Sequence, residues 1–406
     1  MGYFKEAAKG IGWMGALRAF IVGVGIIKIA ILARILSPSQ FGIYGFSLLI
    51  LGLLEAFTET GINIFLIQEK DKTEKYLDSA WVVSIARGTL IALVILATAP
   101  AVALFFKSPE VLPLLYVTSA IAFVRGFINP MEVSFQKNLQ FQKEFRFKGS
   151  LYLLDAVFCI VLAYILVSPI AMVYGMLAAA AVEVAASFII FKTRPALHLD
   201  QAKVKTVINR GKWITGAGTF SYLFTNIDHL VVGRLLGAAP LGLYQQAYRI
   251  STLPVSQVGD VFNKVTFPVY VKIEGDRERL KKAFIKTSLV ILSLVLPFGL
   301  LVFAFSRQLI LLVLGASWLP AEGALKVLAI FGIFKSMLNS SYSLFLSLKK
   351  QNVVMISELM GIIGIGAFIL PLTRTYGLIG AAYAAIIGAV FSLPVIIINF
   401  RKVFTK

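Results

Sequence analysis

The chain has 406 residues, of which 58% are hydrophobic and only 15% are charged, and its mean hydropathy is +0.85. Soluble domains carry roughly 25% charged residues, so this composition excludes a soluble enzyme and a disordered protein. One cysteine, Cys159, excludes an internal disulfide, and two histidines exclude a histidine-rich metal site, so we predict neither a metal site nor catalytic residues.

Apolar stretches long enough to be membrane-spanning helices recur along the whole chain. A helix needs about 20 residues to cross the hydrocarbon core of a bilayer, which is roughly 30 Å thick. Turn-forming residues such as Ser37-Pro38-Ser39 and Ser168-Pro169 separate several of these stretches. We predict twelve spans, over 12–34, 41–66, 80–105, 112–134, 150–167, 170–191, 213–236, 243–268, 284–305, 321–346, 352–372 and 376–399.

The net charge of +19 follows the predicted loops and does not form one basic patch, which argues against a nucleic-acid partner. With the N-terminus inside, the inner loops and tails hold 26 of the 39 Lys and Arg residues, the outer ones hold five, and the spans hold eight. Cytoplasmic loops of membrane proteins collect Lys and Arg. We therefore predict a multi-pass protein of the cytoplasmic (inner) membrane with both termini in the cytoplasm.

The two halves of the chain repeat each other. The pattern of 34–44, which runs from Arg34 to Phe41-Gly-Ile-Tyr44, recurs at 234–244 with an offset of 200. Pro169…Tyr-Gly175 recurs as Pro371…Tyr-Gly377 with an offset of 202. Each half has six predicted spans, so both have the same orientation, and such transporters place their site between the halves near mid-membrane. We predict an N-terminal lobe at 1–196, a cytoplasmic linker at 197–212 and a C-terminal lobe at 213–406.

Ordered blocks of residues in both halves resemble the polysaccharide-exporter branch of the multidrug/oligosaccharidyl-lipid/polysaccharide (MOP) flippase superfamily. The resemblance is closest to the Wzx-type exporters of O-antigen, colanic acid and teichoic acid. The blocks are Ala33-Arg-Ile-Leu-Ser-Pro-Ser-Gln-Phe-Gly-Ile-Tyr44, Gly61-Ile-Asn-Ile-Phe-Leu-Ile-Gln68, Asn129-Pro130, Lys137-Asn-Leu-Gln-Phe141, Gly211-Lys-Trp213, Asn226-Ile-Asp228, Gly233-Arg-Leu-Leu-Gly237, Leu241-Gly-Leu-Tyr244 and Phe267-Pro268.

That resemblance implies both a fold and an activity. The fold is an all-α polytopic membrane protein of two six-helix bundles, related by a pseudo-twofold axis and arranged as a V, as in the MATE branch, around a central cavity. The activity is movement of a polyprenyl-pyrophosphate-linked oligosaccharide, such as an O-antigen repeat unit, from the inner to the outer leaflet by alternating access. The implied partners are undecaprenyl-pyrophosphate-linked oligosaccharide, membrane lipids and polysaccharide polymerase machinery.

Apart from Arg34, Arg234, Lys286 and Glu322 at span ends, sixteen charged residues fall inside the predicted spans. Each costs at least about 2.5–3.5 kcal/mol near mid-bilayer. They must line water, pair with one another or lie at the rims. A rise of 1.5 Å per residue places Lys28, Asp228 and Arg249 together, about 21–24 Å from the inner face. We predict that Asp228 pairs with Arg249 or Lys28, as a gate or structural pair that leaves about one positive charge for a ligand.

A second charged layer lies about 10 Å from the inner face, with bases and acids nearly balanced. We predict that Arg18 pairs with Glu55, and that Arg87 and Arg125 either line the cavity or pair within the first half. Arginine offers paired donors that match phosphate oxygens. The layer comprises Arg18, Glu55, Arg87, Arg125, Glu183 and Lys335, and the predicted pyrophosphate ligands of a cationic cavity are Arg18, Lys28, Arg87, Arg125 and Arg249.

Two routes to energy coupling stay open. A negative interior favours outward movement of an anion by about 2.3 kcal/mol per charge per 100 mV, so the membrane potential alone could drive export. An embedded acid could instead couple transport to H⁺ or Na⁺, and no other cofactor is predicted. Arg34 and Arg234 are repeat-equivalent, and we interpret them as helix-end charges that reach the interface or form an outer gate. The gate, ion-pair and coupling candidates are Glu55, Asp228, Asp260, Glu183, Arg34 and Arg234.

Two other functions fit a polytopic chain. A multidrug or cation antiporter of the same superfamily would want an acidic chamber, whereas the first span carries Arg18 and Lys28 and no acid. A membrane-embedded sugar ligase or polymerase would present catalytic residues on a large outer loop, and the longest predicted outer loop, 306–320, is too short for that.

Overall fold

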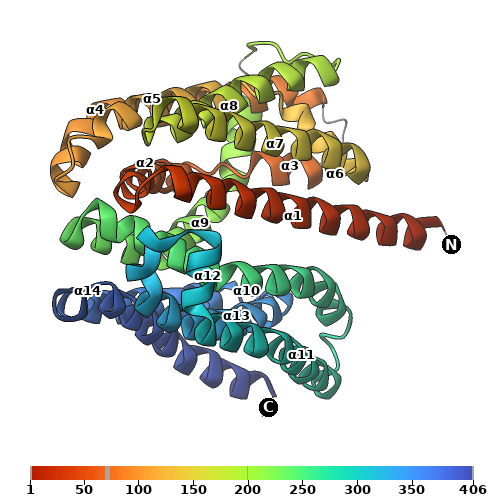
Figure 1. The fold of residues 1–406 in the computed structure, drawn as a ribbon. Helices are drawn as coiled ribbons and strands as arrows, with labels where there is room; N and C mark the ends of the chain where they lie inside the picture. Colours follow the sequence, from red (N-terminus) through yellow and green to blue (C-terminus); the bar gives the residue numbers. More distant parts are fainter. Residues whose placement is uncertain (1, 69–73, 199, 405–406) are drawn as a thin grey trace. The chain divides into compact units, whose positions relative to one another are not determined.

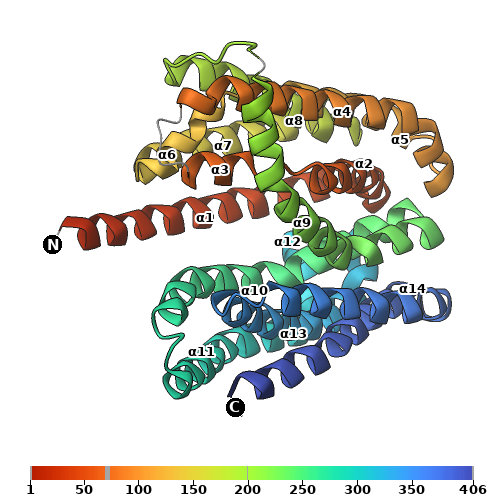
Figure 2. The ribbon, with the colours of Figure 1, turned by 180° about the vertical axis from the view of Figure 1, so that it is seen from behind.

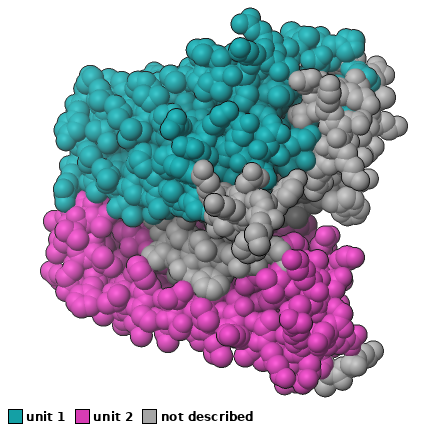
Figure 3. Space-filling view, turned by 90° about the vertical axis from the view of Figure 1, so that its right-hand side faces the viewer, with its two compact units in different colours: residues 1–219 teal, residues 220–406 magenta. Residues whose placement is uncertain are grey.

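The computed structural model describes the backbone of residues 2–68, 74–198 and 200–404. Every regular element in these ranges is helical. Side chains are described throughout them except at 2–11, 64–65, 68, 74–75, 201–215, 217, 253–265 and 268. Contacts divide the chain into unit 1, Met1–Thr219, and unit 2, Phe220–Lys406, which Figure 3 distinguishes by colour.

Unit 1 is built on long apolar helices that are interrupted by short ones (Figure 1). Within it, α1 packs along α7, α4 along α5, and α8 against both α5 and α7, while α2 contacts α5. The elements are α1 (Gly2–Ile35), α2 (Pro38–Phe57), α3 (Ile62–Gln68), α4 (Glu74–Phe106), α5 (Val111–Arg125), the 3₁₀ helix η1 (Pro130–Val133), α6 (Ser134–Lys137), α7 (Phe141–Leu166), α8 (Ile170–Ile190) and the first half of α9 (Gln201–Leu236).

The predicted turn at Ser37-Pro38 is a helix start with a complete local explanation. The Ser37 hydroxyl accepts a hydrogen bond from the main-chain N–H of Gln40 at 3.3 Å, and the Gln40 side chain accepts one from the N–H of Ser37 at 2.8 Å. This reciprocal capping satisfies two N–H groups that a helix start leaves without partners. Proline at the first helical position fits because its fixed φ suits a helix and it has no N–H to satisfy.

Unit 2 is organised around α13, which packs against α10, α11 and α14 (Figure 2). One assigned helix, α14, covers the predicted spans 352–372 and 376–399, and its helical backbone is broken at Gly377, where φ is +58°. The elements after α9 are α10 (Ala238–Lys272), α11 (Arg277–Ala304), α12 (Ser306–Val313), the 3₁₀ helix η2 (Ala316–Ala321), α13 (Glu322–Ser347) and α14 (Gln351–Phe404).

Two predicted spans are broken inside unit 1. The span predicted over 41–66 consists of α2 and α3, separated at 58–61, and the span predicted over 112–134 ends at Arg125 and bends by 69° into η1 and α6. The chain in 58–61 and 126–129 is polar or glycine-containing, and irregular backbone at membrane depth is tolerated where it lines a cavity. Both breaks therefore point to a polar interior in this unit.

Seven of the described helices are long and apolar enough to cross a membrane, or eight if the bent pair formed by α5 and η1–α6 is counted as one span. The protein is therefore a multi-pass membrane protein. The contact-based division falls inside α9, and the structure places most of the predicted linker 197–212 in that helix. The predicted lobe boundaries, 1–196 and 213–406, stay a prediction.

Candidate functional site

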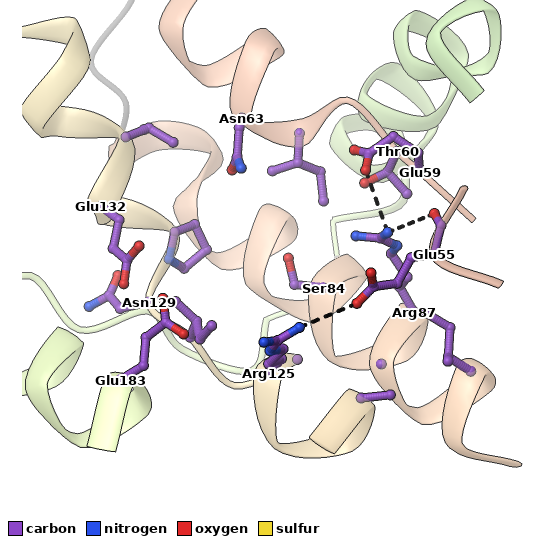
Figure 4. A pocket seen from close by; sticks show the side chains of 18 of the residues that line it. Glu55, Glu59, Thr60, Asn63, Ser84, Arg87, Arg125, Asn129, Glu132 and Glu183 are labelled. Carbon is purple, nitrogen blue, oxygen red and sulfur yellow. Dashed lines mark hydrogen bonds and ion pairs between the residues drawn. The ribbon is translucent and has the colours of Figure 1, made fainter. Parts of the chain in front are cut away.

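A cavity of about 350 Å³ lies within unit 1, between the two helix breaks (Figure 4). Side chains from α2, α3, α4, α5, η1, α6, α7 and α8 face it. Small-molecule pockets occupy about 300–1,000 Å³, so this cavity is large enough for part of a substrate head group. Its ionisable lining residues are Glu55, Glu59, Arg87, Arg125, Glu132, Lys148 and Glu183, and its polar lining includes Thr60, Asn63, Ser84, Asn129 and Gln136.

Asn129 fixes the wall of the cavity where α5 gives way to η1. It is completely buried. Its N–H donates to the Ser187 hydroxyl at 3.1 Å, its side-chain amide donates to the main-chain oxygen of Thr193 at 2.9 Å, and its side-chain oxygen caps η1 at the N–H of Met131, 3.0 Å away. These three bonds hold the bent segment against α8 and the chain that follows it. The dipeptide Asn129-Pro130 thus has a positioning role.

Arg87 and Arg125 meet carboxylates at one end of the cavity. Arg87 donates to the Thr58 hydroxyl at 3.2 Å and to the main-chain oxygen of Glu55 at 2.9 Å, and it lies 3.5 Å from the Glu59 carboxylate. Arg125 lies 3.6 Å from the Glu55 carboxylate. Both ion-pair distances exceed the roughly 2.7–2.9 Å of a strong charge-assisted hydrogen bond. The two guanidinium groups therefore keep donor capacity toward the cavity.

Glu132 and Glu183 line the other end of the cavity, on η1 and α8 (Figure 4). One carboxylate oxygen of Glu132 is buried and has no hydrogen-bond partner. The neighbouring base, Lys148, lies 3.8 Å from Glu144, and Gln136 donates to the same Glu144 oxygen at 2.7 Å. With three bases and four acids in its lining, the cavity as a whole is not strongly cationic.

The structure corrects the predicted pairing of Glu55. Arg18 was the expected partner because the first two spans follow each other in the chain, but the Glu55 carboxylate meets Arg125. The reason is packing, because α2 lies against α5. Arg18 lies on an exposed face of α1 and has interactions of its own. Four residues of the predicted second layer line one cavity: Glu55, Arg87, Arg125 and Glu183. The other two do not, because Arg18 is not among the lining residues and Lys335 belongs to unit 2.

Lys28 also has a different partner from the expected one. Its ammonium group lies 2.7 Å from the Asp155 carboxylate, joining α1 to α7, and both side chains are mostly buried. The thiol of Cys159, one turn further along α7, donates to the other Asp155 oxygen at 3.6 Å. The predicted partner, Asp228, belongs to unit 2. Lys28 is therefore part of an ion pair within unit 1.

Asp228 is the centre of a buried network in unit 2. Its side chain is 2% exposed, and its oxygens accept from the Tyr244 hydroxyl at 2.8 Å and from the N–H of His229 at 2.9 Å. The His229 ring nitrogen lies 2.8 Å from the same carboxylate. Arg249 and Lys28 were the predicted partners. The observed partners are His229, the next residue in the chain, and Tyr244, sixteen positions further on. Arg249 lies on an exposed face of α10 and has interactions of its own.

Aromatic rings extend this network to Lys335. The Lys335 ammonium group donates to the Tyr248 hydroxyl at 2.7 Å and lies 5.2 Å from the centre of the Tyr248 ring and 5.8 Å from that of Phe331. The His229 ring packs edge-on against Tyr244 and Tyr248. A lysine over an aromatic face gains electrostatic stabilisation from the ring. The network thus joins α9, α10 and α13.

Arg34 and Arg234 are not among the residues that line the cavity. Arg34 and Arg234 are in the last turns of α1 and α9, where a cation is favoured by the helix dipole. The side chain of Asp260 lies outside the described residues. Sequence reasoning did not single out four lining residues as site residues: Glu59, Asn129, Glu132 and Lys148. Asn129-Pro130 is nevertheless one of the blocks that carry the family resemblance. Among the described residues, no group of three or more His, Cys, Asp or Glu side chains is placed to hold a metal ion.

These features define a helical, multi-pass membrane protein with a polar cavity in its N-terminal half. Residues 31–323 match the family model described as polysaccharide biosynthesis protein. That match covers more than half of the chain, and the protein belongs to this family.

Named relatives and solved structures agree with this placement. The chain is 26% identical to the lipopolysaccharide biosynthesis protein WzxC of Escherichia coli K12 over 87% of this chain and 72% of that protein. It is 22% identical to the teichuronic acid biosynthesis protein TuaB of Bacillus subtilis 168 over 84% and 71%, respectively. Its fold is similar to that of the lipid II flippase MurJ in an inward closed conformation, with a TM-score of 0.75, 17% identity and coverage of 97% and 90%. The fold is also similar to that of an inward-facing MATE transporter of the MOP superfamily, with a TM-score of 0.74 and 15% identity. That comparison covers 96% of this chain and 94% of the transporter.

Proposed function

We propose that this protein moves a polyprenyl-pyrophosphate-linked oligosaccharide from the inner to the outer leaflet of the cytoplasmic membrane. The observation that carries the proposal is the polar cavity of unit 1, which places seven ionisable side chains inside a membrane protein of the polysaccharide biosynthesis family. Charges inside a membrane protein are costly and mark substrate or ion pathways. The names of WzxC and TuaB, which refer to lipopolysaccharide and teichuronic acid, support a glycan as cargo.

The arginine end of the cavity suits the pyrophosphate of such a substrate. Pyrophosphate in this linkage carries about two negative charges, which cannot cross hydrocarbon without partners. Arg87 and Arg125 have long ion-pair contacts of 3.5 and 3.6 Å, so an entering phosphate can replace the carboxylates at these groups without losing strong bonds. The bidentate donors of arginine match phosphate oxygens. Arg18, Lys28 and Arg249 complete the proposed set of cations.

The proposed topology has twelve spans in two six-helix lobes, with both termini in the cytoplasm and alternating access to a central cavity. The excess of Lys and Arg in the proposed inner loops supports this orientation. A negative interior then favours outward movement of two charges by about 4–5 kcal/mol per 100 mV, so the membrane potential is the simplest proposed driving force. H⁺ or Na⁺ coupling through an acid of the cavity, such as Glu55 or Glu183, is the alternative.

The test is translocation in proteoliposomes. A fluorescent prenyl-pyrophosphate oligosaccharide is incorporated, a potential of either polarity is imposed, and the leaflet reached is read by quenching from outside. We expect protein-dependent translocation that is faster when the donor side is negative. A cationic dye serves as the second substrate. Translocation of the dye without translocation of the glycolipid would replace the proposal with a cation antiporter.

A further inference from the structure

The lining of the unit 1 cavity is divided by charge into two ends. Arg87 and Arg125 occupy one end together with Glu55 and Glu59, and dashed lines in Figure 4 mark the contacts between these side chains. The other end holds Glu132 and Glu183. Arg125 and Lys148 are near enough to act on Glu183 electrostatically, and Lys148 lies 3.8 Å from Glu144, which is outside the lining. A substrate head group that is anionic along only part of its length fits such a division.

The glutamate end requires a hydrogen-bond donor. A buried carboxylate oxygen of Glu132 has no partner in the protein, and a buried polar atom left unpaired costs about 1–3 kcal/mol. The pyrophosphate of a glycosylated substrate is substituted at both ends and carries no O–H, so it cannot donate to this oxygen, whereas a sugar hydroxyl group can. The uncharged groups that share the cavity, including Asn63 and Ser84, can both donate and accept. This combination favours a neutral ligand rich in hydroxyl groups.

We infer that Glu132 and Glu183 bind hydroxyl groups of the sugar next to the pyrophosphate, so that the cavity reads the junction between pyrophosphate and glycan. This inference rests on the proposed function and assigns the two ends of the cavity to the two parts of the substrate. The volume of about 350 Å³ lies at the lower end of the range for ligand pockets, so it accommodates the junction and not a whole repeat unit.

Binding of two short-chain probes to the full-length protein in lipid nanodiscs tests the assignment. One probe is a fluorescent prenyl pyrophosphate, and the other carries the same group linked to a single N-acetylglucosamine. We expect the wild type to bind the sugar-bearing probe more tightly. Glu132→Gln and Glu183→Gln should each weaken its binding about tenfold and leave the sugarless probe unchanged, because an amide oxygen accepts a hydrogen bond from a hydroxyl group less strongly than a carboxylate oxygen does. Asn63→Ala, which changes no charge, should weaken binding of the sugar-bearing probe alone, and by less than the Gln variants do.

The matched control is Glu278→Gln, the same chemical change on an exposed helix surface in unit 2, which should affect neither probe. Equal weakening of both probes by the Gln variants would overturn the inference in favour of a general electrostatic or proton-binding role. Unchanged binding of both probes, or a wild type that does not distinguish them, would also overturn it. Failure of the proposed function looks different: the wild type would bind neither probe and would translocate neither in proteoliposomes.

Discussion

Repeat-equivalent positions in unit 1 and unit 2 carry buried charges of opposite sign. Lys28 in α1 and Asp228 in α9 are related by the 200-residue offset, as are Tyr44 and Tyr244. In unit 1 the base meets an acid from another helix, and the Tyr44 hydroxyl donates to the sulfur of Met176. In unit 2 the acid receives the Tyr244 hydroxyl directly. The backbone pattern of the repeat is thus retained while the sign of the buried charge is reversed.

The surroundings of these charges differ as well. In unit 1 the helix breaks at 58–61 and 126–129 accompany a cavity whose arginines are about a quarter to two-fifths exposed. In unit 2, Asp228, His229 and Tyr244 lie on continuous helices and are at most 5% exposed. Exposed charges with long contacts can exchange partners with a ligand, whereas a sealed network is committed to the protein. We expect ligand contacts in the first case and stability in the second.

The sharpest test of this contrast removes Asp228. Asp228→Ala should destabilise the protein by about 3–5 kcal/mol, because it leaves the Tyr244 hydroxyl without its acceptor and removes a negative charge close to Lys335. For a unit of this size that corresponds to a fall of about 10 °C or more in melting temperature. Thermal unfolding in detergent, followed by fluorescence, measures it. Tyr244→Phe should cost less, since it deletes one hydrogen bond. An Asp228→Ala protein as stable as the wild type would contradict a structural role for the network.

A double substitution of the Lys28–Asp155 pair tests its role in stability separately from any role in transport. Lys28→Met alone should cost about 3 kcal/mol, because it leaves the mostly buried Asp155 carboxylate without its cation. Lys28→Met combined with Asp155→Leu should recover most of that stability, since a buried ion pair can be replaced by apolar residues at little cost. Thermal unfolding measures the stability of both variants, and a proteoliposome assay measures translocation by the double variant. Normal translocation by the stable double variant would remove Lys28 from the proposed pyrophosphate ligands.

Two repeat-equivalent glycines distinguish close packing from a chain break. A Cβ at Gly175 would lie 2.5–2.8 Å from atoms of Cys159, including main-chain atoms of α7, whereas Gly377 has open space and a φ of +58°. Gly175→Ala should therefore cost about 1–3 kcal/mol by overpacking. Gly366→Ala is the matched control, because it lies within a helix with nothing near its Cβ position and should not destabilise. Similar melting temperatures for the two variants would contradict the tight contact between α7 and α8.

A substitution in the unit 1 cavity should have the smallest effect on stability and yet reduce transport. Arg125→Gln should change stability by less than about 1 kcal/mol, because the pair with Glu55 is more than one-third exposed on both sides. Translocation should fall about tenfold, since a charged hydrogen bond to the substrate is lost. Proteoliposome rates and melting temperatures of the same preparation test both parts. Loss of stability with normal translocation would reverse our distinction between the two units.

Much of this architecture follows from the sequence alone. Apolar length placed most of the helices. Local turn chemistry placed a break at Ser37-Pro38-Ser39, where α2 begins, although the span itself was predicted to start at 41. The in-register blocks around Tyr44 and Tyr244 indicated the repeat and the family. The cost of burying charge in a membrane also showed that Glu55, Arg87, Arg125 and Glu183 needed water or partners. Each of these conclusions depends on local composition or on spacing along one helix, which a sequence specifies directly.

Partner choice was decided only by the tertiary structure. Depth along a helix axis can be counted from the sequence, but it does not say which helices are neighbours. Glu55 meets Arg125 because α2 packs on α5, and Lys28 meets Asp155 because α1 runs along α7. The breaks at 58–61 and 126–129 lie within stretches whose average hydropathy predicts a continuous span. A side chain has a reach of only a few ångströms, so helix packing and these breaks together determine which charges pair and which face the cavity.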